Sequence, residues 1–524
     1  MVSVKFKNEN ITIEVEKGTK LSECIRIANL SIETPCNCMG LCNKCKVKVI
    51  GEVSPLSLLE QNFILNEENI RLACITAVIG DVEVELFNTN KNLKTINSGH
   101  SIEVDVDVDN NILGMSNNTN VMLGVAIDIG TTGLSAYLVD LHSGKTLNKT
   151  SCLNPQTEFG SDVLSRIAFA INNEEGTKIL RDAIVNEINH MLKELLNKNY
   201  EVDNIYRIMI AANTTMLHFF AGVNPASIAR APYKATFLNK MDLSPSEIGI
   251  PINREGIVTL LPSASAYVGA DILAGIVATD FYRKKNSSIF IDIGTNGEIV
   301  VISDGKMVAT STAAGPALEG MNISCGSRAE EGAIDSFSID KEYNISFTTI
   351  GGSVAKGICG SALIDIAASM VEKEIILKSG RFNKKLNNKL SNRVRDKKFY
   401  ITEDIYISQK DIRQIQLAKG AIAAGMSMLL VEVNIALEMI EEVVIAGAFG
   451  YHINAESIKT IGLIPKGFKG EITYVGNSSI EGARLALINK GILETIINFE
   501  DKIEIVELST KDTFQDFFIE ALSF

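Results

Sequence analysis

Five cysteines between residues 36 and 74 are spaced in a way that suits metal binding. Cys36, Cys42 and Cys45 form a C-x5-C-x2-C segment, and Cys74 follows in the separate segment RLACITAV. This spacing is one residue longer than the plant-type C-x4-C-x2-C…C pattern, in which one loop supplies three thiolates and a fourth comes from elsewhere. We therefore expect Cys36, Cys42, Cys45 and Cys74 to hold a [2Fe–2S] cluster.

Two alternatives stay open for these cysteines. A zinc site usually has two C-x2-C-like pairs, and only Cys42 and Cys45 have that spacing. The other alternative is a set of thiols without a ligand. Cys38 competes with Cys36 as the first ligand. We prefer Cys36, because it directly follows Pro35 and gives the loop the longer reach.

Two glycine–threonine segments, AIDIGTTG and FIDIGTNG, have the composition of phosphate-binding turns. In each, an apolar strand would bring an aspartate, Asp128 or Asp292, to the edge of a tight turn. Turn residues donate N–H groups and hydroxyls to phosphate, and a carboxylate beside phosphates suits Mg²⁺. These turn residues are Gly130, Thr131 and Thr132 in the first segment and Gly294, Thr295 and Asn296 in the second. The duplication predicts a nucleotide held between two similar halves.

A third glycine cluster follows another apolar strand, in VVIAGAFGYHI. Gly447, Ala448 and Gly450 leave room for a flat group such as adenine, although a close contact between a helix and a strand would need the same small residues. Glu298 and Glu319 lie in glycine-rich segments near the phosphate loops and are candidates for contact with a nucleotide or a partner.

The elements that would position these residues form a β-rich domain, a linker and two α/β halves. Alternating residues at 2–6 and 11–15 predict a hairpin, residues 20–30 have helical spacing, and 81–87 reads as a closing strand. The linker is rich in Asn, Ser and Asp, with one short strand expected at 102–108. The expected borders are 1–88 for the first domain, 89–120 for the linker, 121–275 for the first half and 276–524 for the second.

Composition limits the classes of protein. The 524-residue chain is 46% hydrophobic, with a formal net charge of −13, so a nucleic-acid partner is not expected. We see no apolar run long enough to span a membrane and no signal peptide. We therefore expect a cytoplasmic protein without a membrane partner, in a reducing compartment where clustered cysteines bind metals more often than they form disulfides.

The motifs also carry a resemblance. AIDIGTTG, FIDIGTNGEI, AAGPALEG (313–320) and IAGAFG are similar to motifs of the actin, sugar kinase and Hsp70 ATPase superfamily. Together with NPQTEFGSDVLSRI (154–167) and the cysteine domain, the chain from about residue 33 onward resembles the reductive activators of corrinoid proteins. The resemblance implies a β-grasp ferredoxin-like domain, then a duplicated actin-like (ribonuclease H-like) ATPase fold.

The resemblance also implies cofactors and site residues. Those cofactors are a [2Fe–2S] cluster, ATP and Mg²⁺, with the same four cysteines as cluster ligands. Asp128 and Asp292 would be the catalytic carboxylates at the phosphates and Mg²⁺, and Gly315 and Glu319 would join the nucleotide site. The chain departs from the usual family pattern at Asn37, Cys38 and Asn43, where glycines are usual.

In that family an electron passes from the cluster to an inactive Co(II) corrinoid and restores its Co(I) state for methyl transfer, with the help of ATP. The implied partner is a corrinoid iron–sulfur protein or an O-demethylase corrinoid subunit. A low-potential electron donor must supply the cluster, and a homodimer stays open. Two other classes compete: a small-molecule kinase with Asp162 or Asp271 as its base, and a redox-sensing chaperone-like ATPase.

Overall fold

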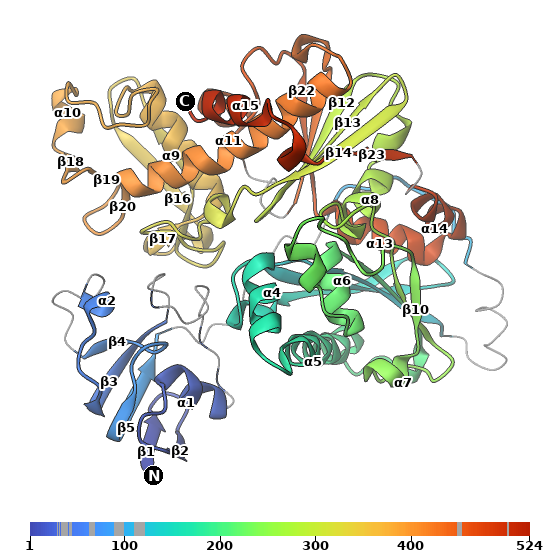
Figure 1. Cartoon of the computed structure of the whole chain (residues 1–524), viewed down its shortest axis with the longest axis horizontal. Coiled ribbons are helices and arrows are strands. Elements are labelled where there is room, and N and C mark those ends of the chain that lie inside the picture. The colour runs from blue at the N-terminus through green and yellow to red at the C-terminus, as the bar shows by residue number, and fades with distance from the viewer. Residues whose placement is uncertain are drawn as a thin grey trace.

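The structure is a computed structural model, which describes residues 1–28, 30, 32, 40, 45–61, 69–87, 99–108, 121–447, 453–499 and 502–524. The N-terminal domain lies at the lower left of Figure 1, beside the two larger lobes that the rest of the chain forms.

The N-terminal domain has the β-grasp arrangement expected from the sequence. Its five-stranded sheet has the order β2-β1-β5-β3-β4, in which β1 and β5 are parallel. Alternate residues of the strands are buried because their side chains point to opposite faces of the sheet. The elements are β1 (Val2–Phe6), β2 (Ile11–Val15), α1 (Leu21–Ile27), β3 (Lys46–Val53), α2 (Leu58–Gln61), β4 (Ile70–Leu72) and β5 (Val78–Leu86).

Residues 99–108, expected to lie in a free linker, contact the second module, which consists of the two α/β halves (residues 121–524). Gly99 forms a bridge with Gly476, and Asp107 forms one with Asn489. The backbone N–H of Ile102 donates to the carbonyl of Ala278 at 2.9 Å. The strand predicted at 102–108 is wrong, because these residues make isolated bridges and no continuous ladder.

The first half of the second module is built on a six-stranded sheet of order β10-β11-β9-β6-β7-β8. Its central strands β6 and β9 are parallel and almost wholly buried, as in sheets covered on both faces. The strands are β6 (Leu123–Ile129), β7 (Gly133–Asp140), β8 (Thr146–Leu153), β9 (Ile205–Ala212), β10 (Met241–Leu243) and β11 (Ile257–Leu260). The main helices are α4 (Val163–Asn172), α5 (Gly176–Leu196), α6 (Thr214–Ala221), α7 (Pro245–Ile248) and α8 (Ala270–Ala278).

The second half repeats this pattern in a sheet of order β22-β21-β12-β13-β14-β23. In both halves an antiparallel three-strand meander is joined to a parallel strand at its first member, β9 on β6 and β21 on β12. This correspondence confirms the internal duplication. The strands are β12 (Ser288–Ile293), β13 (Gly297–Ser303), β14 (Lys306–Thr312), β21 (Glu442–Ala446), β22 (Glu471–Gly476) and β23 (Ile503–Ile505).

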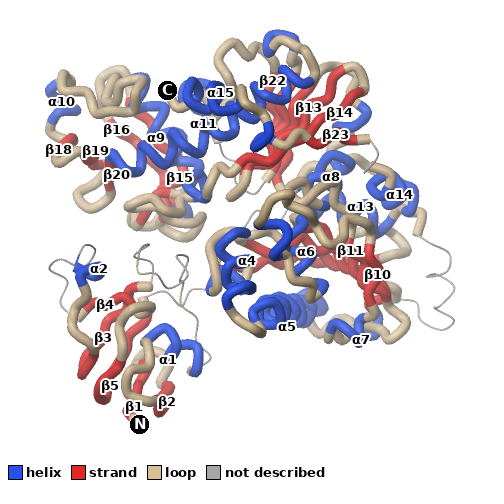
Figure 2. Tube along the Cα trace, in the orientation of Figure 1, coloured by secondary structure: helices blue, strands red, loops and turns tan. Residues whose placement is uncertain are grey.

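Two helices lie between the two large sheets (Figure 2), namely α8 and α13 (Ser478–Ile488). Although α13 comes late in the chain, it packs against α8 and against β6 and β9 of the first sheet. One hydrophobic core therefore joins residues of both halves. The border drawn between residues 275 and 276 stays a prediction, since the chain crosses between the halves again near its end.

An additional subdomain stands between β14 and β21 in the chain, at the upper left of Figure 1. It contains two small sheets, of order β16-β15-β17 and β18-β19-β20. Its helix α9 packs against β15, and the long helix α11 packs against β13 and β14. Its strands and flanking helices are β15 (Ala333–Ile339), β16 (Ile345–Thr349), β17 (Gly357–Ile358), α9 (Gly360–Glu372), α10 (Asn388–Ser391), β18 (Val394–Arg395), β19 (Lys398–Tyr400), β20 (Tyr406–Ser408) and α11 (Gln409–Glu432).

Within the described part of the chain, only α11 is long and apolar enough to pass a composition test for a membrane span. The best window of this helix is 78% buried inside the protein. Its apolar residues therefore belong to the core.

Candidate functional sites: a cysteine cluster and a nucleotide cleft

Two of the four predicted cluster ligands lie on adjoining segments of the N-terminal domain. Cys45 directly precedes β3 and Cys74 lies in the turn after β4, and both are almost fully buried. The backbone N–H of Ala73 donates to the carbonyl of Cys45 at 2.8 Å, which joins the two segments next to the cysteines. Cys36 and Cys42, as well as the competing Cys38, lie outside the described residues.

This arrangement fits a [2Fe–2S] cluster. Such clusters need one loop of cysteines and a further thiolate from another segment, and Cys45 and Cys74 come from two adjacent segments of one small sheet. When bound, a [2Fe–2S] cluster accepts and releases a single electron at a low potential.

A cleft of about 540 Å³ separates the two halves of the second module. Both phosphate loops line it, with Asp128, Gly130, Thr131 and Thr132 on one side and Asp292, Gly294, Thr295 and Asn296 on the other. Each loop is a tight turn between antiparallel strands: Gly130 N–H donates to the Gly133 carbonyl and Gly294 N–H to that of Asn296, both at 2.9 Å. The sequence prediction that the two loops face one site is met by this geometry.

Glu319 lies between the two loops. Its Oε2 atom accepts hydrogen bonds from the hydroxyl of Thr132 at 3.2 Å and from that of Thr295 at 3.1 Å. Gly315 does not line the cleft itself. It adopts a φ of 74° at the start of the short turn Pro316–Glu319, which brings Glu319 to the loops.

Asp128 is held from the far end of the chain. Its two carboxylate oxygens accept hydrogen bonds of 2.8 Å from the side chains of Asn477 and Ser479, at the start of α13. Gly447 also lines the cleft, and with a φ of 96° it lies so near Asp292 that a Cβ atom would come within 2.7 Å of Oδ1. The other two residues of that predicted adenosine segment, Ala448 and Gly450, lie outside the described residues.

Six acidic residues line this cleft: Asp128, Asp271, Asp292, Glu298, Glu319 and Asp335. Burial, followed by repulsion from neighbouring carboxylates, raises the pKa of Asp271 to about 8 and that of Asp292 to about 7. Burial likewise raises the pKa of Asp128 and Glu319, although their hydrogen bonds counteract it. A bound cation would offset the repulsion between these carboxylates.

Mg²⁺ fits this set of side chains. Among the described residues, no three or more His, Cys, Asp or Glu side chains are grouped so that they could hold a metal ion by themselves. Mg²⁺ in nucleotide sites is usually held by one or two carboxylates, with phosphates and water completing its shell. Asp128 and Asp292, one from each loop, can supply those carboxylates. Bound there, Mg²⁺ would neutralise phosphate charge.

Side chains of the segment NPQTEFGSDVLSRI donate hydrogen bonds to the backbone of the first phosphate loop. The Asn154 side chain donates to the Gly130 carbonyl at 2.8 Å, and the buried Arg166 guanidinium donates to the Thr131 carbonyl. Asp162, a candidate base in the kinase hypothesis, caps α4 by accepting from the Ser165 N–H, and it does not line the cleft. Asp271, the other candidate, does line it.

Sequence reasoning missed several lining residues, chiefly Asn213, Asn477 and Ser479. Asn213 and Asn477 share a recognisable signal. Each directly follows a strand, β9 or β22, and caps the next helix, α6 or α13, with its side chain. A polar cap at that point lies at the carboxyl end of a strand, where ligands bind in α/β sheets.

Comparison with known protein families identifies each domain of this chain. The sequence profile of the C-terminal, ASKHA domain of RACo matches residues 286–524, that of the RACo middle region matches 123–284, and that of the 2Fe-2S iron-sulfur cluster binding domain matches 4–78. The chain is thus a [2Fe–2S] protein joined to an ATPase of the actin and sugar kinase class.

Relatives that match most of the chain identify its family more closely. A corrinoid activation enzyme, RamQ of Eubacterium limosum, is 35% identical over 73% of this chain and 67% of its own length. The [Co(II) methylated amine-specific corrinoid protein] reductase of Methanosarcina barkeri is 28% identical over 77% of each. A solved reductive activator for corrinoid, iron-sulfur protein has a TM-score of 0.71 and 30% identity, and the match covers 100% of this chain and 98% of the other. The chain belongs to the family of ATP-dependent reductive activators of corrinoid proteins.

Proposed function

We propose that this chain transfers one electron from its N-terminal domain to the Co(II) corrinoid of a partner protein and thereby restores Co(I). The observation that carries the proposal is the joining, in one chain, of Cys45 and Cys74 on adjoining segments with a carboxylate-lined cleft between duplicated halves. We assign Cys36, Cys42, Cys45 and Cys74 as the cluster ligands. The partner would be a corrinoid iron–sulfur protein or an O-demethylase corrinoid subunit.

In this proposal the cleft binds ATP. The turns at Gly130–Thr132 and Gly294–Asn296 would bind its phosphates through N–H and hydroxyl groups. Asp128 and Asp292 would hold Mg²⁺, while Asn477 and Ser479 fix the orientation of Asp128. Gly447, Ala448 and Gly450 would face the adenosine. The contact of Gly447 with Asp292 supports this placement.

ATP is needed because the electron transfer is uphill. A plant-type [2Fe–2S] cluster has a potential of about −400 mV, and the Co(II)/Co(I) couple in the family lies lower. Each 59 mV of gap costs about a factor of ten for one electron. Nucleotide can lower that cost only by favouring one of two states of the protein. Closure of the two halves around Glu319 is the change that we assign to it.

The bound segment 99–108 limits how far the N-terminal domain can move. Gly99 is held beside Asn477. The 11 residues between Phe87 and Gly99 limit the distance between these two residues to about 40 Å. The cluster must meet the partner's corrinoid within the range that this limit allows. We also propose a reducing, cytoplasmic location, a low-potential electron donor and, as an open choice, a homodimer.

The test is to mix the chemically reduced protein with a Co(II) corrinoid protein and follow the cobalt spectrum, with and without ATP and Mg²⁺. We expect Co(I) to form faster and to a greater extent with ATP, and Asp128→Asn to abolish that difference while leaving the iron content unchanged. Equal rates and extents in all arms would remove the proposed role of the nucleotide.

A further inference from the structure

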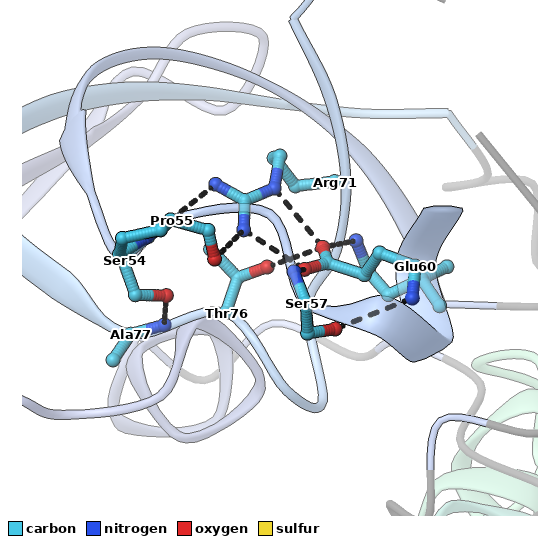
Figure 3. Close-up of polar contacts among 8 residues, drawn as sticks. Ser54, Pro55, Ser57, Glu60, Arg71, Thr76 and Ala77 are labelled. Atoms are coloured by element: carbon cyan, nitrogen blue, oxygen red, sulfur yellow. Dashed lines mark hydrogen bonds and ion pairs between the residues drawn. The ribbon is translucent and has the colours of Figure 1, made fainter. Parts of the chain in front are cut away.

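A buried ion pair between Glu60 and Arg71 lies beside Thr76 (Figure 3), two residues after Cys74 in the chain. Glu60, in α2, has no exposed surface, and Arg71, in β4, is 8% exposed. Glu60 Oε1 accepts from Arg71 Nε at 3.0 Å, and Glu60 Oε2 accepts from Arg71 Nη2 at 2.9 Å. The two side chains thus form a bidentate pair, the strong geometry for Arg and a carboxylate.

The same carboxylate also holds the turn on both sides of Cys74. Oε1 accepts from the backbone N–H of Leu72 at 3.1 Å and from the hydroxyl of Thr76 at 2.9 Å. Leu72 and Thr76 are the second residues before and after Cys74. The turn closes on itself as well, because the Thr76 N–H donates to the Leu72 carbonyl at 3.0 Å.

Stability alone is a poor explanation for this ion pair. Removing two charges from water is costly, and apolar pairs of similar volume often serve as well or better. A buried carboxylate does what no apolar side chain can do, because it accepts donors from the two ends of one turn. Groups that orient a metal ligand have large effects on metal affinity and on the electronic properties of the site.

The ion pair also sets the charge near Cys74. Among the described residues, Arg71 gives its other hydrogen bonds to the carbonyls of Ser54 and Pro55, which are neutral. Glu60 therefore supplies the negative charge that the Arg71 guanidinium contacts. Reduction adds an electron to a cluster, so an uncompensated buried cation beside it favours the reduced form.

We propose that Glu60 is a positioning residue for the cluster ligand Cys74: it fixes the turn from Leu72 to Thr76 at both ends, and its pairing with Arg71 keeps the charge beside that ligand balanced. This inference rests on the assignment of Cys74 as a ligand in the proposed function. It assigns Glu60 and Arg71 a role in setting both the retention and the potential of the cluster.

The test uses the full chain with its cluster and two measurements, the midpoint potential and the rate of iron loss to a chelator. Glu60→Gln keeps the size of the side chain and removes its charge. We expect it to favour the reduced form about tenfold, a positive shift of about 59 mV. In Glu60→Gln/Arg71→Met both charges are gone, and the shift should fall below twofold. Glu83→Gln, which makes the same charge change at an exposed ion pair of the same domain, should leave both measurements unchanged.

Thr76→Val tests the positioning role without any change of charge. It removes one of the two donors that flank Cys74 and keeps the volume, so iron loss should be at least threefold faster at an unchanged potential. This variant decides the question alone should Glu60→Gln fail to take up iron. The inference is overturned if Glu60→Gln shifts the potential no more than Glu83→Gln does, or if Thr76→Val loses iron at the normal rate.

Cys74→Ser separates this inference from the proposed function. A normal cluster spectrum in Cys74→Ser would show that the ligand assignment itself is wrong. An altered or lost spectrum, together with unaffected Glu60→Gln and Thr76→Val proteins, would leave the ligand in place and refute only the role of Glu60.

Discussion

Thr132 and Thr295, one from each phosphate loop, donate hydrogen bonds to the same oxygen of Glu319, at 3.2 and 3.1 Å. The two threonines lie on the equivalent turns after β6 and β12 but one position apart in the repeat, because Thr295 aligns with Thr131 and Thr132 aligns with Asn296. Glu319 thus links the halves at the point where the phosphates of ATP would bind. Any change in the distance between the loops must alter at least one of these two bonds.

The first prediction concerns this link. Glu319→Ala leaves both threonine hydroxyls without their acceptor, a loss of about 1–3 kcal/mol. We expect corrinoid-stimulated ATP turnover to fall about 10- to 100-fold. Glu319→Gln, which keeps an acceptor oxygen, should lose less. The control is Glu504→Gln, at an exposed ion pair with Lys306. Equal activity in Glu319→Ala and this control would contradict the link.

The second prediction concerns the support of Asp128 by the start of α13. Asn477→Ala removes a 2.8 Å hydrogen bond to its carboxylate, and a bond to a charged group contributes about 1.5–3 kcal/mol. We expect Mg²⁺-ATP to bind about 10- to 100-fold more weakly in a fluorescent-nucleotide titration. Asn454→Ala, which removes the equivalent cap from the exposed start of α12 (Ala455–Ile461), should bind nucleotide normally.

The third prediction is a pH dependence of stability. Burial and carboxylate repulsion raise the pKa of Asp271 to about 8 and that of Asp292 to about 7 in the folded chain, whereas an unfolded Asp has a pKa of about 3.9. The folded chain therefore binds more protons in between, and the stability that these protonated groups contribute is complete below about pH 4 and is lost as the pH rises through 7 and 8.

Thermal unfolding checks this dependence. Without Mg²⁺, Tm should fall between pH 6 and pH 8.5, and added Mg²⁺ should reduce that fall because it binds the ionised carboxylates. The doubly substituted Asp271→Asn/Asp292→Asn protein should show a much flatter profile. A profile as steep as that of the unsubstituted chain would show that other groups control the effect.

The fourth prediction concerns the contact between the N-terminal domain and the first half. Arg26 Nε donates to Glu158 Oε1 at 3.1 Å, and the guanidinium lies 5.8 Å from the centre of the Phe159 ring. A partly exposed pair of this kind contributes about 0–1 kcal/mol. Arg26→Ala should therefore raise the ratio of detached to docked N-terminal domain by no more than about fivefold.

Small-angle scattering should then report a larger radius of gyration, and Co(II) reduction should be up to a few times faster because the domain reaches its partner more often. Arg283→Ala, at another exposed pair beside an aromatic ring, is the matched control. A slower reaction in Arg26→Ala would indicate that this contact is the productive arrangement.

Local patterns predicted much of the fold and part of the site. The repeated strand–turn–strand segments identified both phosphate loops, because the chemistry of a loop that lies between two adjacent strands is contained in a few consecutive residues. Asn477 and Ser479 escaped prediction, since they reach Asp128 across 349 and 351 residues of sequence. Only the crossing of α13 into the first half brings them there.

The segment 99–108 shows a different limit. Its alternating residues suggested a strand, but it meets only Ala278 and the ends of β22 and α13, with which it forms single hydrogen bonds and isolated bridges. The polar composition suggested a free linker. Composition could not reveal that Asp107 and Asn489 form hydrogen bonds with backbone groups.

The most direct test is a single-turnover experiment with the reduced protein, a Co(II) corrinoid protein and Mg²⁺-ATP under anaerobic conditions. The account predicts that Co(I) appears in step with the oxidation of the iron–sulfur centre, one for one, and that omission of ATP or the Asp128→Asn substitution suppresses both signals together. Formation of Co(I) at full yield without oxidation of the iron–sulfur centre, or with equal yield in the absence of ATP, would contradict it.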